Sequence, residues 1–226
     1  MESVLFHGSE KIVDNPTKVG GKVHNDFGQG FYCTPDIQLA REWSCTEAPS
    51  AFVNHYSFEP SYSLKICNLA GKEFNILNWL AILMSNRVFE TSHSTPAAVK
   101  RYIIEEFLPD LSGYDIIRGY RADDSYFQYT NLFLSGTISL EQLNEAMHLG
   151  NLGEQVFIQS EKAFEALVFT SAEVVDRSVY LPRRLARERK AREAFHKMKS
   201  GPSVFDGIFA IDVYRNKMKN DDIRIR

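Results

Sequence analysis

The sequence has few cysteines, no long apolar run and none of the common metal-binding spacings. Its three cysteines, Cys33, Cys45 and Cys67, are odd in number and lack Cys-x-x-Cys spacing. This usage favours a reducing compartment and argues against a structural zinc site. No His-Glu-x-x-His or calcium-loop motif occurs, so no metal is expected. No apolar stretch approaches the ~20 residues that cross a bilayer, so no membrane association is expected.

Targeting and nucleotide-binding signatures are also missing. Met1 leads directly into a predicted strand, without a basic segment, an apolar core or a cleavage site. This predicts a cytoplasmic protein, or one delivered into a target cell without a cleavable signal peptide. Residues 26–30, Asp-Phe-Gly-Gln-Gly, lack the third glycine of a dinucleotide fingerprint, and no Gly-Lys-Ser/Thr follows. The triplet Asp26-Phe27-Gly28 is also found in protein kinases as a metal-binding motif, but no glycine-rich loop, strand lysine or His-Arg-Asp loop precedes it here.

Composition predicts a globular protein with a basic C-terminal region. The 226 residues are 44% hydrophobic and 12% aromatic, which is ample for a core. The formal net charge is −3, yet residues 181–200 hold eight Lys or Arg and two Glu. We therefore predict a catalytic domain over 1–180 and a helical extension over 181–226 packed on it. The basic helix near 183–199 is either solvated against an acidic body or a surface for nucleic acid or another acidic partner. Its apolar positions, Leu185, Phe195 and Met198, are expected to dock on the body.

Hydrophobic periodicity and turn residues predict an α+β fold. Thr34-Pro35-Asp36 is a helix start, with Thr34 as a possible cap. Ser139-Leu-Glu-Gln142 is a capping box. The segments 51–58 and 62–68 are expected to pair around Glu59-Pro60-Ser61. Strands are predicted at 4–9, 51–58, 62–68, 114–120, 154–158 and 167–175. Helices are predicted after 34, near 74–90, 96–107, 139–149 and 183–199, and from Ser203. Two more are predicted, one that contains Tyr126, Phe127 and Phe133 and one through Ala163, Phe164 and Leu167.

Two N-terminal motifs carry most of the functional information. The first is the apolar run Val4-Leu5-Phe6 that ends in His7-Gly8-Ser9, and the second is Asp26-Phe27-Gly28-Gln29-Gly30-Phe31-Tyr32. Histidine offers a directional hydrogen bond near neutral pH. Glycine allows close approach of the backbone to a ligand, and aromatic faces stack on flat rings. Together these groups suit a planar heterocycle joined to a sugar.

The two motifs resemble those of the His-Tyr-Glu class of ADP-ribosyltransferases, in particular an uncharacterised bacterial branch. The resemblance runs from His7 to about Leu167. It implies a split antiparallel sandwich with surrounding helices, which binds NAD as co-substrate in the cleft between two sheets. By this resemblance the Gly8 backbone would hold the nicotinamide amide, His7 would bond a ribose hydroxyl and Tyr32 would stack on the nicotinamide ring. The full set of NAD-binding candidates is His7, Gly8, Ser9, Asp26, Phe27, Gly28, Gly30, Phe31, Tyr32 and Arg121.

The chemistry sets further demands on the site. Breaking the nicotinamide–ribose bond releases a neutral leaving group and develops positive charge on the ribose. A carboxylate or amide must stabilise this charge, and a second polar group must serve the acceptor. The resemblance places this group in the strand Gly153-Glu154-Gln155-Val156. The resemblance favours Gln155, because the related sequences carry glutamine at this position, and Glu154 is the adjacent alternative. Strand neighbours face opposite ways, so only one of the two can face the expected cleft.

Residues 121–124 supply the remaining candidates. Arg121 is a candidate for the NAD pyrophosphate, since arginine forks onto such groups. Asp123 and Asp124 are candidates for ribose hydroxyls or for the acceptor, and they are equally suited to cap a helix. The catalytic candidates are Gln155, Glu154, His7, Tyr32, Asp123 and Asp124.

The sequence thus predicts a mono-ADP-ribosyltransferase acting as a toxin, an effector or a regulatory enzyme. Its acceptor would be a macromolecule, more plausibly a protein than a nucleic acid. Two alternatives stay open. One is an NAD glycohydrolase that uses the same pocket, and the other is a catalytically weak NAD-fold module that binds a protein or nucleic-acid partner.

Overall fold

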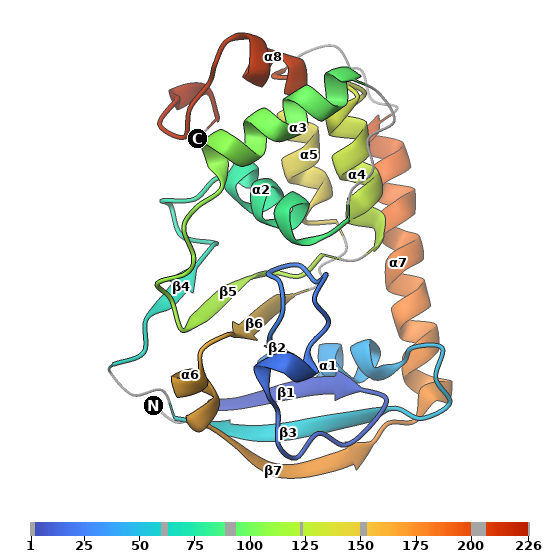
Figure 1. The fold of residues 1–226 in the computed structure, drawn as a ribbon. Helices are drawn as coiled ribbons and strands as arrows, with labels where there is room; N and C mark the ends of the chain where they lie inside the picture. Colours follow the sequence, from blue (N-terminus) through green and yellow to red (C-terminus); the bar gives the residue numbers. More distant parts are fainter. Residues whose placement is uncertain are drawn as a thin grey trace.

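The chain folds into two β-sheets and a layer of helices, which confirms the α+β class (Figure 1). The structure is a computed structural model that describes residues 3–59, 63–88, 94–122, 124–149, 153–199 and 207–225. In Figure 1 the sheets occupy the lower part of the molecule and most helices the upper part. The long helix α7 (Arg177–Lys199) runs along one side and spans both parts.

The first sheet is antiparallel and has the strand order β1-β3-β7. Its strands are β1 (Ser3–Ser9), β3 (Phe52–Phe58) and β7 (Leu167–Val174). Phe6 lies opposite His55, and the pairing of β3 with β7 shifts between His55 and Tyr56. All three strands were predicted within a residue or two of these bounds.

The second sheet is mixed, with the strand order β2-β6-β5-β4. Its strands are β2 (Phe31–Cys33), β6 (Glu154–Ile158), β5 (Ile116–Tyr120) and β4 (Ile66–Asn68). Strand β4 runs parallel to β5, so the expectation of a wholly antiparallel fold is wrong for this pair. Two helices connect β4 to β5, and such a crossover returns the chain parallel. The predicted pairing of 51–58 with 62–68 is also wrong, because β3 and β4 belong to different sheets.

The two sheets share a core built by alternate residues of their strands. Phe31 and Cys33 of β2 and Val156 and Ile158 of β6 pack with Leu5, Tyr56 and Phe58 of the first sheet. The intervening residues Tyr32 and Phe157 point to the other face, where they join the core beneath the helices. This alternation decides which candidates can share a site.

The first six helices are α1 (Ile37–Ser44), α2 (Ile76–Asn86), α3 (Ser94–Phe107), α4 (Asp124–Leu134), α5 (Leu140–Ala146) and α6 (Glu161–Glu165). Four of them, α1, α2, α5 and α6, begin at capping side chains. Ser139 and Gln142 form the predicted capping box of α5. The predicted cap Thr34 is wrong, because Asp36 caps α1 by accepting from the amides of Gln38 and Leu39. A short 3-10 turn, Lys18–Gly20, lies between β1 and β2.

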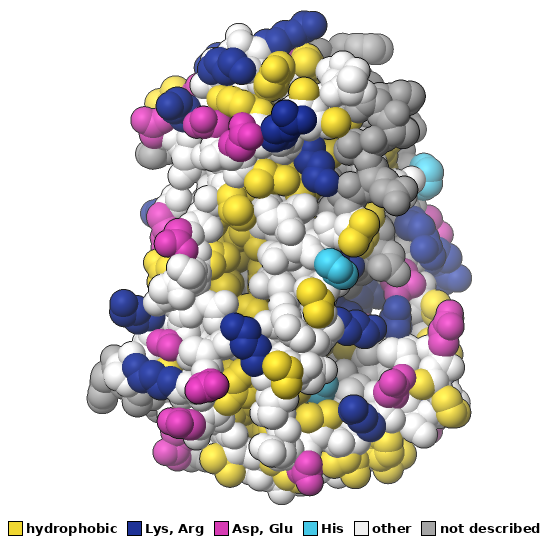
Figure 2. All heavy atoms as spheres, in the orientation of Figure 1, with side chains coloured by type: hydrophobic (Ala, Val, Ile, Leu, Met, Phe, Trp, Pro, Cys, Tyr) yellow, Lys and Arg dark blue, Asp and Glu magenta, His cyan; other side chains and the backbone are white. Residues whose placement is uncertain are grey.

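The C-terminal region packs on the rest of the chain. Phe195 of α7 is buried against the ring of Tyr129 at 4.1 Å, and Met198 packs on the same core. Leu185 is 51% exposed, so its expected docking is wrong. Basic side chains gather on the side along which α7 runs (Figure 2). Two of them, Arg184 and Arg187, are not purely solvent-facing, since they bond to Cys45 O and Glu42 on α1.

The last described elements are α8 (Ala210–Arg215) and a 3-10 turn, Ile223–Ile225. The helix α8 lies against α3 and α4. The predicted helix start at Ser203–Asp206 lies outside the described residues. Among the described helices, none is both long enough and apolar enough to cross a bilayer.

Candidate functional site

His7 has a fixed orientation at the edge of the first sheet. Its Nδ1 lies 2.7 Å from the carbonyl oxygen of Tyr32, and its ring packs on Phe31 at 4.3 Å. A carbonyl only accepts, so Nδ1 carries the proton and Nε2 is the acceptor of the neutral ring. Burial lowers the pKa of His7, with the Tyr32 contact opposing the shift. The imidazole is therefore suited to accept a hydrogen bond from a hydroxyl group.

Gly8 is required by packing, and its backbone faces outward along the same edge. A Cβ there would lie 2.0 Å from the carbonyl oxygen of Ala40 in α1. Phe6 exchanges two hydrogen bonds of 2.9 Å with Thr34, on the side away from β3. Backbone groups alternate along an antiparallel strand, so the N–H and C=O of Gly8 point to this side as well. They are suited to bind a planar amide at the edge.

Ser9 belongs to a structural network at the end of β1. Its hydroxyl donates to Lys11 O at 2.6 Å and accepts from the buried amide of Asn54 at 2.9 Å. Asn54 also donates to His7 O and accepts from Val13 N. The network holds the segment after β1 against β3. Its clearest role is to keep His7 and Gly8 in place.

Asp26 is a buried junction between four elements. Its Oδ2 accepts from Ala122 N at 3.0 Å and from Gln155 Nε2 at 3.1 Å. Its Oδ1 lies 2.5 Å from Arg87 at the end of α2. Arg87 in turn lies over the ring of Phe127 at 4.9 Å. Asp26 therefore links the glycine turn, residues 26–30, to α2, β5 and β6, and these contacts account for the burial of its side chain.

Tyr32 is committed to the same turn. Its hydroxyl donates to Gly28 O at 2.7 Å and accepts from Phe27 N at 3.0 Å. Its ring packs on Phe157 at 4.8 Å, on the face of β2 opposite to Phe31. Burial raises the pKa of Tyr32, so the phenol stays protonated. The structure brings the Tyr32 backbone, not its ring, to His7.

The backbone conformation and packing of the glycine turn account for the residues that it contains. Gly28 has φ +92°, a conformation that favours glycine, and its amide donates to Asn25 O. A Cβ on Gly30 would lie 2.3 Å from the Phe157 ring. Phe27 is buried beside Tyr32 and Phe157. Phe27, Gly28 and Gly30 therefore shape the turn and its packing on Tyr32 and Phe157.

Glu154 and Gln155 lie on opposite faces of β6. Gln155 is 3% exposed and donates to Asp26 and to Tyr120 O beneath the helices. Glu154 lies on the face of Val156, toward the first sheet, and forms a two-pronged ion pair with Arg118. The hydrogen bond to Glu154 is the main cause that raises the pKa of Arg118. Of the two residues, Glu154 shares the face of His7.

Arg121 lies beside α1. Its guanidinium is 4.2 Å from the centre of the Trp43 ring, and the indole N–H of Trp43 is buried without a hydrogen-bond partner among the described residues. The sequence carries no signal that Trp43 lies beside Arg121, because the two residues meet only through the packing of α1. Asp123 lies outside the described residues, as does the side chain of Asp124 at the start of α4.

The candidates therefore fall into two groups. His7, Ser9 and Glu154 lie on the strand faces that the two sheets turn toward each other, and the backbone of Gly8 lies at the edge of β1. Val156 lies opposite Cys33, and the antiparallel bridge between Phe6 and Thr34 places His7 at the level of Cys33. Along the strand direction, Glu154 is therefore displaced from His7 by about two residues, roughly 7 Å. Asp26, Phe27, Tyr32 and Gln155 form the second group, beneath the helices. Within the described ranges, no three His, Cys, Asp or Glu residues are grouped to hold a metal ion.

Comparison with known proteins gives one match. A family profile described as "Protein of unknown function (DUF3990)" matches residues 3–169. The match covers most of the chain, from β1 into β7, and leaves α7 and α8 outside. No curated protein and no solved structure matches the chain.

Proposed function

This chain belongs to the DUF3990 family, and we propose that it is a mono-ADP-ribosyltransferase that moves ADP-ribose from NAD to a macromolecular acceptor. The fold proposed for it is the split sandwich of the ADP-ribosyltransferases. The observation that carries the proposal is the edge of β1, where a neutral, fixed imidazole adjoins an outward-facing glycine backbone.

NAD fits this edge by its donor and acceptor pattern. The outward N–H and C=O of Gly8 would pair with the carboxamide of nicotinamide, which has one acceptor and one donor group. Nε2 of His7 would accept from a ribose hydroxyl. Arg121 lies over the ring of Trp43 at the C-terminal end of α1, and its guanidinium would suit a pyrophosphate. Gly8 and His7 are therefore the primary NAD contacts of the proposal.

The transfer step assigns the carboxylate to Glu154. The bond between the nicotinamide nitrogen and ribose C1′ breaks, and nicotinamide leaves neutral with the electron pair. The acceptor then bonds to C1′ and gives up a proton. A carboxylate near the ribose stabilises the positive charge in between. Glu154 lies on the face of β6 that is turned toward the first sheet, whereas the buried amide of Gln155 is bound to Asp26. We therefore propose Glu154 in place of Gln155.

Incubation of the protein with NAD labelled in its ADP-ribose part tests the proposal, in a cell lysate with nuclease and protease controls. Label on protein supports the transferase. Free ADP-ribose indicates the glycohydrolase, in which water replaces the acceptor. Unchanged NAD, together with no NAD binding by calorimetry, would overturn both. NAD binding without turnover would instead indicate a binding module.

A further inference from the structure

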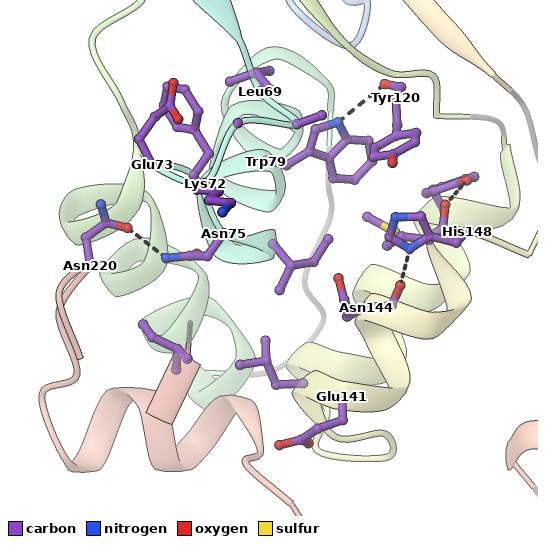
Figure 3. A pocket seen from close by; sticks show the side chains of 18 of the residues that line it. Leu69, Lys72, Glu73, Asn75, Trp79, Tyr120, Glu141, Asn144, His148 and Asn220 are labelled. Carbon is purple, nitrogen blue, oxygen red and sulfur yellow. Dashed lines mark hydrogen bonds between the residues drawn. The ribbon is translucent and has the colours of Figure 1, made fainter. Parts of the chain in front are cut away.

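A cavity lies away from His7, at the carboxyl ends of the parallel strands β4 and β5. Its volume is about 590 Å³, within the range of about 300–1,000 Å³ typical of small-molecule sites. Figure 3 shows it between the β4–α2 connection, α2, α5 and the C-terminal segment. Ligands of α/β sheets commonly bind beyond such strand ends.

Aromatic rings form one wall of this cavity. Trp79 of α2 is 7% exposed and packs on Tyr126 at 5.7 Å. The Tyr126 hydroxyl donates to Met147 O at 2.5 Å, which fixes that ring. Tyr120, at the end of β5, keeps 44% of its surface exposed and meets His148 edge-on at 4.8 Å. Two of these rings are preorganised, and the exposed ring of Tyr120 is placed to cover a flat ligand.

Polar side chains that line the cavity can orient a ligand through hydrogen bonds, and their formal charges cancel. Nδ1 of His148 donates to Asn144 O at 2.7 Å, so Nε2 is its acceptor, and no described residue bonds to it. The charged side chains at the rim, Lys72, Glu73, Glu141 and Arg224, balance in sign. Arg224 is also bound through two atoms to Asp222. A cavity with this balance favours an uncharged ligand over an anion or a cation.

We infer that this cavity binds an uncharged planar heterocycle of nucleoside size. Aromatic walls supply stacking surface, and Asn144 and His148 supply hydrogen bonds to ring-edge groups. The site goes beyond the proposed NAD chemistry and does not depend on it. None of its walls includes His7, Gly8 or Glu154.

The chain holds two tryptophans, which makes the site directly observable. In the Trp43→Phe variant of the full chain, Trp79 is the sole tryptophan, and inosine is titrated while its fluorescence is followed. We expect saturable quenching by inosine and none by ribose, which lacks the ring. Calorimetry with the unmodified chain repeats the measurement if the variant does not fold.

Two exposed residues locate the binding. Tyr120→Ala and His148→Ala should each weaken inosine binding about fivefold or more. His24→Ala is the matched control, since His24 is also exposed and its Nδ1 also bonds a backbone carbonyl, that of Asn86. His7→Asn should leave inosine affinity unchanged. Absence of binding to the unmodified chain, or equal weakening by His7→Asn and His148→Ala, would overturn the inference.

Discussion

Glu154 and Gln155 are neighbours in sequence, yet they serve different parts of the molecule. Gln155 holds the buried carboxylate of Asp26 in place, whereas Glu154 at the start of β6 and its partner Arg118 on β5 are partly exposed. A charge acts on a reacting ribose only from the face that the substrate reaches. The two positions therefore separate a stabilising role from a catalytic one, and substitution distinguishes them.

Glu154→Gln should lower NAD turnover by about 100-fold or more and change NAD affinity less than about threefold, because charge stabilisation acts chiefly in the transition state. Turnover and calorimetric NAD affinity are the two measurements. Glu165→Gln, an exposed glutamate on α6, is the control for loss of charge. Wild-type turnover in Glu154→Gln would remove β6 from the catalytic machinery and make Asp123 or Asp124 the better candidate.

Gln155→Ala should act on stability instead. It removes hydrogen bonds to Asp26 and Tyr120 O inside the protein, which costs about 1–3 kcal/mol of the free energy of unfolding. Chemical denaturation of the wild type and the variant measures this difference. Unchanged stability combined with lost turnover would restore Gln155 as the catalytic residue.

His7 should make stability depend on pH. Burial lowers its pKa in the folded state, so the unfolded chain takes up a proton more readily, beginning near the unperturbed value of about 6.5. Its contribution is therefore fully present above pH ~6.5 and is lost as the pH falls toward the folded pKa. Denaturation between pH 7.5 and 5 should show this loss in the wild type and a smaller one in His7→Asn. Equal pH slopes would contradict the assignment.

At the scale of elements, α7 depends on an ion pair with α1. Glu42 is buried, with 8% of its side chain exposed, and Arg187 reaches it at 2.8 and 2.9 Å. Arg187→Met should leave this carboxylate buried and unpaired, at a cost of about 3 kcal/mol. The matched control is Arg189→Met, because Arg189 and Glu193 are both 69% exposed and their pair contributes little. Denaturation measures both, and equal effects would show that α7 is not held by this pair.

Hydrophobic periodicity predicted the positions of the helices and strands well, but it predicted less well which strands pair with one another. Strand 154–158 was predicted to the residue, since Gly153 precedes it and the apolar run Val156-Phe157-Ile158 ends it before Gln159. The parallel pairing of β4 with β5 carries no local signal, because it depends on where α2 and α3 return the chain. The same limit applies to the site. Alternation predicted that only one of Glu154 and Gln155 faces the site. Which of the two does so depends on which face of β6 packs against the first sheet, and the sequence does not show this.

At the scale of the whole molecule, α7 contacts both the helical core and the region of the first sheet. The upper part of α7 packs on the helical core through Phe195, and its lower part bonds to α1 beside the first sheet. The sequence suggested a boundary near residue 181, yet α7 begins at Arg177 and continues through Pro182. Both the basic helix and the residues after it bury side chains on the body. The C-terminal region is therefore structurally part of the fold.

Truncation after Leu181 tests this conclusion. It removes Phe195, which stacks on Tyr129, and Met218, whose carbonyl accepts from Tyr102, and so exposes two buried aromatic rings. Loss of a buried phenylalanine alone costs about 3–5 kcal/mol. The melting temperature should therefore fall by about 10 °C or more, with increased binding of a hydrophobic dye. A second truncation after Lys199 keeps Phe195 and removes Met218, and it should melt between the two. An unchanged melting temperature after the first cut would show that residues 182–226 form an independent arm.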